Sequence, residues 1–179
     1  VPRSGGAAQA LTPANEDAAY GDLSPDGRTL AFARTENGAT RVCLKPLPGG
    51  AERELTRFSS TVPRWSPDGK WIAFSRDRSL ESGIFITHPD GTSMRRITAR
   101  GGWPEWLPDG KGLVFRILAT DGTQQIETVT LEGGVVAPWG KIKFSGDNEP
   151  FDVSPDGSLI TYTNSETFSS EIWSLDLRQ

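Results

Sequence analysis

The chain has 179 residues, enough for one domain with a hydrophobic core. Its net charge is −4, so basic residues are not in excess to neutralise a phosphate backbone, and nucleic acid is excluded as the primary partner. The single cysteine excludes an internal disulfide, and no apolar run reaches the roughly 20 residues that a membrane-spanning helix needs. The 20 glycines and 13 prolines favour many short strands joined by turns over long helices.

The first repeating unit, within residues 20–56, is predicted to contain four short strands. An inner strand ends at Leu23 and leads into a Ser-Pro-Asp-Gly turn. A second strand follows at 29–33, where apolar residues occupy consecutive positions. After a polar loop and a Gly-Gly turn, the third and fourth strands are predicted at 41–47 and 52–56.

The same pattern recurs three times, every 41 to 47 residues, in units at 61–98, 102–139 and 149–177. The second strands are predicted at 71–75, 112–116 and 159–163, and the third strands at 83–88, 125–131 and 171–177. Fourth strands are predicted at 94–98 and 135–139, whereas the fourth unit ends after its third strand.

The repeated turn has a clear local role. Proline sets φ for the first corner of a type I turn, aspartate suits the second corner, and glycine accepts the left-handed conformation that follows. The aspartates Asp26, Asp68, Asp109 and Asp156 have the same neighbours in every unit, apart from a leucine in place of serine in the third. A catalytic aspartate would be unique, so we predict that these four are scaffolding.

The second strands are apolar at consecutive positions, which predicts burial on both faces of each sheet. Sheets stacked face to face around an axis satisfy this requirement, so the predicted fold is an all-β propeller of four four-stranded antiparallel blades. The Pro-Asp-Gly turns resemble the PD40 repeat of the TolB-like propeller family, and no Gly-His or Trp-Asp dipeptide recurs as in WD40 repeats. The resemblance covers residues 7–177 and implies a ring of six or more blades.

How the ring closes is left open by the sequence. Residues 7–12 match the fourth strand of the first unit position for position, so we expect them to supply an outer strand to the last blade, in the same chain or in a second copy. Three arrangements follow: a complete four-bladed ring, two chains that share strands in an eight-bladed homodimer, or part of a longer propeller.

Catalysis is not expected. His88 is the only histidine and precedes a Pro-Asp-Gly hairpin turn, and no Gly-x-Ser-x-Gly motif is present. One histidine and one cysteine, Cys43, cannot form a zinc site. We therefore predict no catalytic residue, no cofactor and no bound metal.

Candidate binding residues come from the inner strands and from the loops that lead into them. Four charged residues occupy equivalent positions near the end of the inner strands, where they are expected to surround the central channel: Asp22, Arg64, Glu105 and Asp152. The longest loop, at 141–150, and the shorter loop at 99–104 add five candidates: Trp103, Phe144, Asp147, Asn148 and Glu149. A calcium site at Asp147, Asn148 and Glu149 is the less favoured alternative, because no EF-hand pattern accompanies them.

These observations predict a non-catalytic module that binds a protein or peptide partner. The family resemblance implies a bacterial envelope or sensor protein in a periplasmic or other extracytoplasmic setting, while a cytoplasmic location stays open. Two alternatives are an accessory propeller domain of a multidomain hydrolase and a metal- or glycan-binding propeller.

Overall fold

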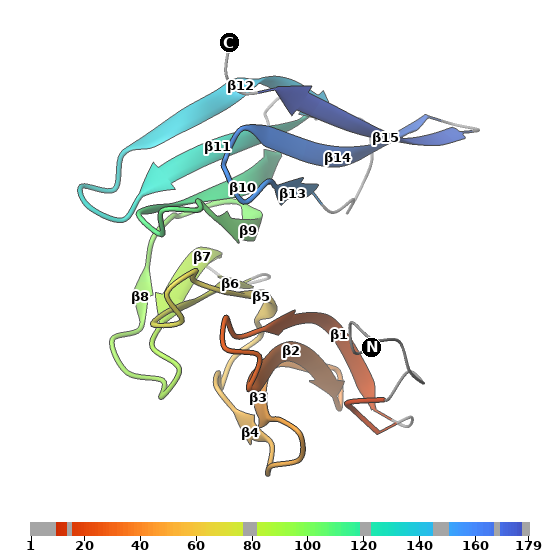
Figure 1. Cartoon of the computed structure of the whole chain (residues 1–179), viewed down its shortest axis with the longest axis vertical. Coiled ribbons are helices and arrows are strands. Elements are labelled where there is room, and N and C mark those ends of the chain that lie inside the picture. The colour runs from red at the N-terminus through yellow and green to blue at the C-terminus, as the bar shows by residue number, and fades with distance from the viewer. Residues whose placement is uncertain are drawn as a thin grey trace.

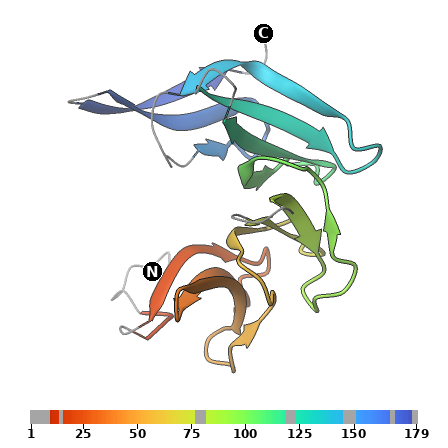
Figure 2. The ribbon, with the colours of Figure 1, turned by 180° about the vertical axis from the view of Figure 1, so that it is seen from behind.

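The computed structural model describes residues 10–13, 16–76, 82–118, 123–144, 151–166 and 169–176. These residues form fifteen strands and no helix. The strands make four antiparallel sheets, and Figures 1 and 2 show that the sheets follow one another along an arc. The fold class predicted from the repeats is therefore confirmed: the chain is an all-β propeller segment.

Each repeat unit forms one sheet, called here blade 1 to blade 4. Blade 1 contains β1 (Asp17–Leu23), β2 (Thr29–Glu36), β3 (Ala39–Pro46) and β4 (Arg53–Glu54). Blade 2 contains β5 (Thr61–Trp65), β6 (Ile72–Arg76), β7 (Gly83–Thr87) and β8 (Arg95–Arg96). Blade 3 contains β9 (Gly102–Trp106), β10 (Gly112–Leu118), β11 (Gln124–Thr130) and β12 (Val136–Phe144). Blade 4 contains β13 (Phe151–Val153), β14 (Leu159–Glu166) and β15 (Ser169–Asp176).

The hydrophobic core lies between neighbouring sheets. Ala31 of blade 1 packs with Ile72 and Phe74 of blade 2, whereas Ala73, the residue between these two, packs toward blade 3. Val114 of blade 3 packs in the same way with Ile160 of blade 4. Successive residues of a strand point to opposite faces, so both faces of the second strands are buried, as the consecutive apolar residues predicted.

The Pro-Asp-Gly turns are scaffolding, held by their own side chains. In blade 2 the Ser66 Oγ donates to Asp68 Oδ1 over 2.7 Å and accepts the Trp71 amide over 2.9 Å. Asp68 Oδ1 also accepts the amide of Lys70. The turns at Ser24 and Ser154 repeat these bonds, whereas Leu107 replaces the serine in blade 3 and packs against the core.

Neighbouring turns also lie against one another. A side chain placed at Gly69, where φ is +70°, would contact Pro25 of the preceding turn, and Gly110 and Gly157 stand in the same relation to Pro67 and Pro108. A side chain at Gly27 would meet no atom within 4 Å. The turns of blades 2, 3 and 4 thus each lie against the turn of the preceding blade.

A β-bulge interrupts each of the inner strands β1, β5 and β9. Tyr20, Val62 and Trp103 have left-handed backbones with φ of 56°, 51° and 56°, although none of them is glycine. The pairing register with the second strand shifts at each of these positions. A bulge bends a strand and changes the direction in which the next side chains point, so this repeated feature sets the orientation of the inner-strand residues.

Residues 141–144 belong to strand β12 and not to a loop, because the backbone of β12 continues to pair with β11 as far as Phe144. Of the predicted outer strand at 7–12, only residues 10–12 are described, and they form no strand. The completion of blade 4 by residues 7–12, in one chain or in a homodimer, therefore stays a prediction. No helix among the described residues is long and apolar enough to cross a membrane.

The turn analysis generates a stability prediction. Replacing Ser66 by alanine removes a 1%-exposed hydroxyl and leaves the Trp71 amide without its acceptor. We expect a loss of about 1–3 kcal/mol in the free energy of unfolding, measured by urea denaturation. Ser158→Ala is the matched control, because its hydroxyl binds Asp156 at the surface and its loss should cost under about 0.5 kcal/mol. Equal stability of the two variants would contradict this account of the turn.

Candidate functional site

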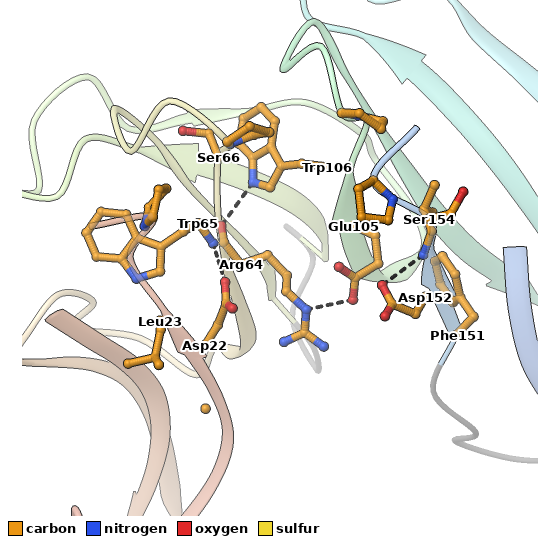
Figure 3. A pocket seen from close by; sticks show the side chains of 16 residues that line it. Asp22, Leu23, Arg64, Trp65, Ser66, Glu105, Trp106, Phe151, Asp152 and Ser154 are labelled. Atoms are coloured by element: carbon orange, nitrogen blue, oxygen red, sulfur yellow. Dashed lines mark hydrogen bonds and ion pairs between the residues drawn. The ribbon is translucent and has the colours of Figure 1, made fainter. Parts of the chain in front are cut away.

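The inner strands of all four blades converge on one cavity of about 620 Å³, shown in Figure 3. We call it the turn-end cavity, because the prolines of the four Pro-Asp-Gly turns form part of its wall. The lining residues that bear on its chemistry are Asp22, Leu23, Arg64, Trp65, Glu105, Trp106, Phe151 and Asp152. The four charged residues predicted to surround the channel are thus brought together.

Asp22 links blade 1 to blade 2. Its Oδ2 atom accepts the amide of Trp65 over 2.6 Å, a bond that crosses between the two inner strands. Burial raises the pKa of Asp22 above the usual range for an aspartate, against the opposing effects of the Trp65 amide and of Arg64. One carboxylate oxygen is therefore committed to joining the blades.

Arg64 and Glu105 form an ion pair between blades 2 and 3. The Arg64 Nε atom lies 2.6 Å from Glu105 Oε1, and the two side chains are 20% and 15% exposed. Burial raises the pKa of Glu105 to about 7, although Arg64 acts in the opposite direction. A parallel bond from Trp106 Nε1 to the Arg64 carbonyl oxygen, at 3.0 Å, holds the same two strands together.

Asp152 is the most accessible member of the set. It is exposed, and its Oδ1 atom accepts the amide of the next residue, Val153, over 2.8 Å. Its negative charge contributes to raising the pKa of both Asp22 and Glu105, so the three carboxylates interact electrostatically. Because Arg64 is paired with Glu105, the net charge of the cavity is negative.

The other candidates do not join this cavity. Trp103 lies in β9 two residues before Glu105, and it lines a different cavity. Phe144 ends β12, the outermost strand of blade 3, and only its backbone is described. Asp147, Asn148 and Glu149 lie outside the described residues. Their proposed role in binding, and the calcium alternative, stay predictions.

The sequence analysis did not identify the turn prolines as part of the site. The sequence predicts the Pro-Asp-Gly turns as scaffolding, and the structure shows that their prolines also line the turn-end cavity: Pro25, Pro67, Pro108 and Pro155. Their position in the sequence could have indicated this role, because each proline follows the charged inner-strand residue by only three positions. A short turn keeps such a residue close to the strand that it leaves.

The side chains of His88 and Cys43 lie outside the turn-end cavity and make structural contacts. The ring of His88 stacks on Trp71 with 3.9 Å between the ring centres, and its Nδ1 atom lies 2.9 Å from the carbonyl oxygen of Lys70. Cys43 is fully buried, and burial raises the pKa of its thiol to about 12. Within the described residues, no group of three histidine, cysteine, aspartate or glutamate side chains is placed to hold a metal ion.

Comparison with known proteins agrees with this architecture. The family model described as the TolB beta propeller domain, PD40, matches residues 3–179. An uncharacterized protein of Agrobacterium fabrum is 28% identical over 177 residues, which cover 90% of this chain and 59% of that protein. The Tol-Pal system protein TolB of Desulfosudis oleivorans is 30% identical over 111 residues, which cover 60% of this chain and 25% of that protein.

A solved structure shows the same fold. TolB from Acinetobacter baumannii superposes with a TM-score of 0.77 at 21% identity, over 88% of this chain and 40% of that protein. The chain thus spans less than two thirds of the length of these relatives. Because the family model covers almost the whole sequence, the chain belongs to the PD40 family of TolB β-propeller domains.

Proposed function

We propose that this domain is a non-catalytic module that binds a protein or peptide partner, and that the turn-end cavity receives a basic group of that partner. The observation that carries the proposal is the convergence of three carboxylates and one arginine on a single cavity. The carboxylates of Asp22 and Asp152 outnumber the single positive charge of Arg64, whose Nε atom lies 2.6 Å from Glu105, so the cavity attracts a cation whether Glu105 is ionised or protonated. A lysine or arginine side chain, or a peptide amino terminus, has this chemistry.

The walls of the cavity fit a long cationic side chain. Apolar groups surround the carboxylates, among them Leu23, which is 50% exposed, and the half-buried ring of Trp65. Figure 3 shows Leu23 and Trp65 on the same side of the cavity as Asp22. Lysine and arginine combine an aliphatic stem with a charged head, so they can contact apolar and acidic groups together.

The setting is proposed from similarity. A relative with the name Tol-Pal system protein TolB supports a role in an extracytoplasmic assembly of the bacterial envelope. The alternative of an accessory propeller in a multidomain hydrolase concerns sequence outside the 179 residues and stays a prediction. A binding role is favoured for this domain because the turn-end cavity gathers charged side chains, while the hydroxyls of Ser66 and Ser154 in its wall are bound to aspartates within their own turns.

The first test uses a fluorescein-labelled decapeptide of alternating lysine and glycine, with fluorescence anisotropy as the readout. We expect the peptide to bind the whole chain, and Asp152→Asn to weaken binding about three- to tenfold, because it removes an accessible charge from the cavity. Glu132→Gln is the matched control: it removes the same charge from an exposed residue outside the cavity. A peptide of glutamine and glycine reports binding that does not depend on charge.

Two results would overturn the proposal. One is the absence of binding by the lysine peptide at any concentration up to millimolar. The other is an equal loss of affinity in Asp152→Asn and Glu132→Gln, because the effect would then come from the net charge of the chain and not from the cavity.

The pH dependence of binding gives a second prediction. Because burial raises the pKa of Glu105 to about 7, its carboxyl is mostly protonated at pH 6 and mostly ionised at pH 8. The cavity gains negative charge over this interval while lysine stays fully charged. We expect the lysine peptide to bind about two- to fivefold more tightly at pH 8 than at pH 6. Glu105→Gln should bind the peptide equally at both pH values. If the variant instead kept the pH dependence of the wild type, the effect would come from a group other than Glu105.

A further inference from the structure

A polar cavity of about 370 Å³ lies between blades 1 and 2, near the start of strand β1. We call it the blade-junction cavity, and it shares no lining residue with the turn-end cavity. The residues that bear on its chemistry are Asp17, Tyr20, Thr35, Thr40, Ser59 and Thr61. We propose that this cavity binds one neutral sugar ring of a carbohydrate ligand, a role that goes beyond the protein or peptide binding proposed above.

Small side chains create the cavity. Ala33 lies opposite Ala19 in the register of β1 and β2, and it shares a face with Ala31, which packs on blade 2. In blade 2 the equivalent position holds Ser75, whose Oγ atom accepts the Trp103 amide over 2.9 Å and joins blade 2 to blade 3. Alanine cannot make this bond, and its small side chain leaves room between blades 1 and 2.

Hydroxyl groups line much of this space. Thr35 Oγ1 lies 3.0 Å from Thr40 Oγ1 on the neighbouring strand, and the segment that leads into blade 2 adds Ser59, Ser60 and Thr61. The Ser60 amide donates to the Thr40 carbonyl oxygen over 3.0 Å, so this segment is held against β3 before a ligand arrives. A hydroxyl can donate one hydrogen bond and accept two. The Thr35 and Thr40 pair therefore keeps capacity for hydrogen bonds to a ligand.

Asp17 is the one charged residue among the described residues that line the cavity. It is exposed, and its carboxylate has no hydrogen bond or ion pair within the parts of the chain that the structure describes. In the register of β1 and β2 it lies directly opposite Thr35. A carboxylate accepts hydrogen bonds through both of its oxygens. Asp17 can therefore accept two neighbouring hydroxyl groups of one ligand, and it disfavours a ligand with negative charge.

Tyr20 adds an aromatic ring to the wall. The residue is 43% exposed, and its ring meets the Trp103 ring edge to face, with 5.2 Å between ring centres. Tyr20 and Thr61 also line the cavity of about 710 Å³ that contains Trp103, so the two cavities adjoin at these residues. The C–H groups on the face of a sugar ring are apolar and pack against aromatic rings. Tyr20 is placed to make this contact.

These features together favour a sugar over other small ligands. A small anion would meet the carboxylate of Asp17 and no cationic group in the described lining. An apolar side chain would leave the hydroxyls of Thr35 and Thr40 without new partners and would not use Asp17. A neutral sugar ring has hydroxyls at its edge and an apolar face, which match the two kinds of wall. The cavity volume lies near the lower limit of small-molecule sites, about 300–1,000 Å³, and therefore suits a single ring.

The experiment uses saturation-transfer difference NMR on the whole chain, with the methyl glycosides of glucose, galactose and mannose in both anomeric forms as probes. We expect at least one glycoside to bind. Asp17→Ala should weaken its binding about five- to tenfold, because hydrogen bonds to a charged acceptor are lost. Since the Asp17 carboxylate has no partner within the described residues, this change should leave the melting temperature unaltered. Glu132→Ala is the matched control, because Glu132 is exposed and lies outside the cavity.

A second variant tests the aromatic contact. Tyr20 has a left-handed backbone with φ of 56°, which glycine adopts readily. Tyr20→Gly therefore removes the ring without adding backbone strain, and it should weaken glycoside binding at least about threefold. The uronic acid counterpart of the bound glycoside differs from it by one carboxylate. We expect that compound to bind more weakly than the neutral glycoside, because its charge would lie near Asp17.

Several outcomes would overturn the inference. They are the absence of saturation transfer to every glycoside at millimolar concentration, an equal effect of Asp17→Ala and Glu132→Ala, or equal binding of the uronic acid. The proposed function is tested separately, because Asp152→Asn should leave glycoside binding unchanged. Conversely, a lysine peptide that fails to bind the turn-end cavity would not affect the result for the blade-junction cavity.

Discussion

Face-to-face burial of the second strands is the constraint on which the rest of this structure depends. Ala31, Ala73 and Val114 are completely buried, and each is turned toward the next blade along the chain. Neighbouring residues such as Phe74 and Phe115 fill the opposite faces. A sheet with two apolar faces is unstable in water unless both faces are covered. The blades must therefore stack, and stacking of twisted sheets leads the chain around an axis.

Stacking alone does not create a binding site, because the inner strands must also present polar groups at the axis. The bulges accomplish this by shifting the register within β1, β5 and β9. After the shift, Asp22 and Arg64 reach across to the next inner strand, where they bind the Trp65 amide and Glu105. The same charged groups thus hold neighbouring blades together and form the wall of the turn-end cavity. Their structural and proposed binding roles are not separate.

Much of the fold was predictable because the same local sequence signals occur in each of the four repeat units. The turn residues, the consecutive apolar strands and the equivalent charged positions all have short-range signatures. The convergence of Asp22, Arg64, Glu105 and Asp152 followed from that equivalence. By contrast, residues 141–144 were expected to lie in a loop, although polar and apolar residues alternate there as they do in a strand, and pairing with β11 extends β12 as far as Phe144.

The second cavity, which Trp103, Arg100 and Arg116 line, could not be predicted for a similar reason. Arg116 belongs to a strand read from its apolar neighbours, and Arg100 belongs to a connecting loop. The bulged residues Tyr20, Val62 and Trp103 have positive φ, although their side chains do not favour it. Sequence patterns predict a left-handed backbone where glycine or asparagine occurs. Tertiary contacts, such as the 2.9 Å bond from the Trp103 amide to Ser75 Oγ, determine it here.

The differences among the repeats point to the positions that matter for recognition. Where the blades meet, equivalent positions hold residues of the same kind: alanine or valine on one face, larger apolar residues on the other. Around the axis, the geometry is repeated but the chemistry is not. The bulge position holds tyrosine, valine and tryptophan in the first three blades. The position two residues later holds an acid in three blades and an arginine in the other. A scaffold needs the same side chain in every unit, whereas a binding site needs different groups at fixed places. The inner strands combine repeated backbone geometry with varied side chains, which is the arrangement expected of a surface that recognises an asymmetric partner.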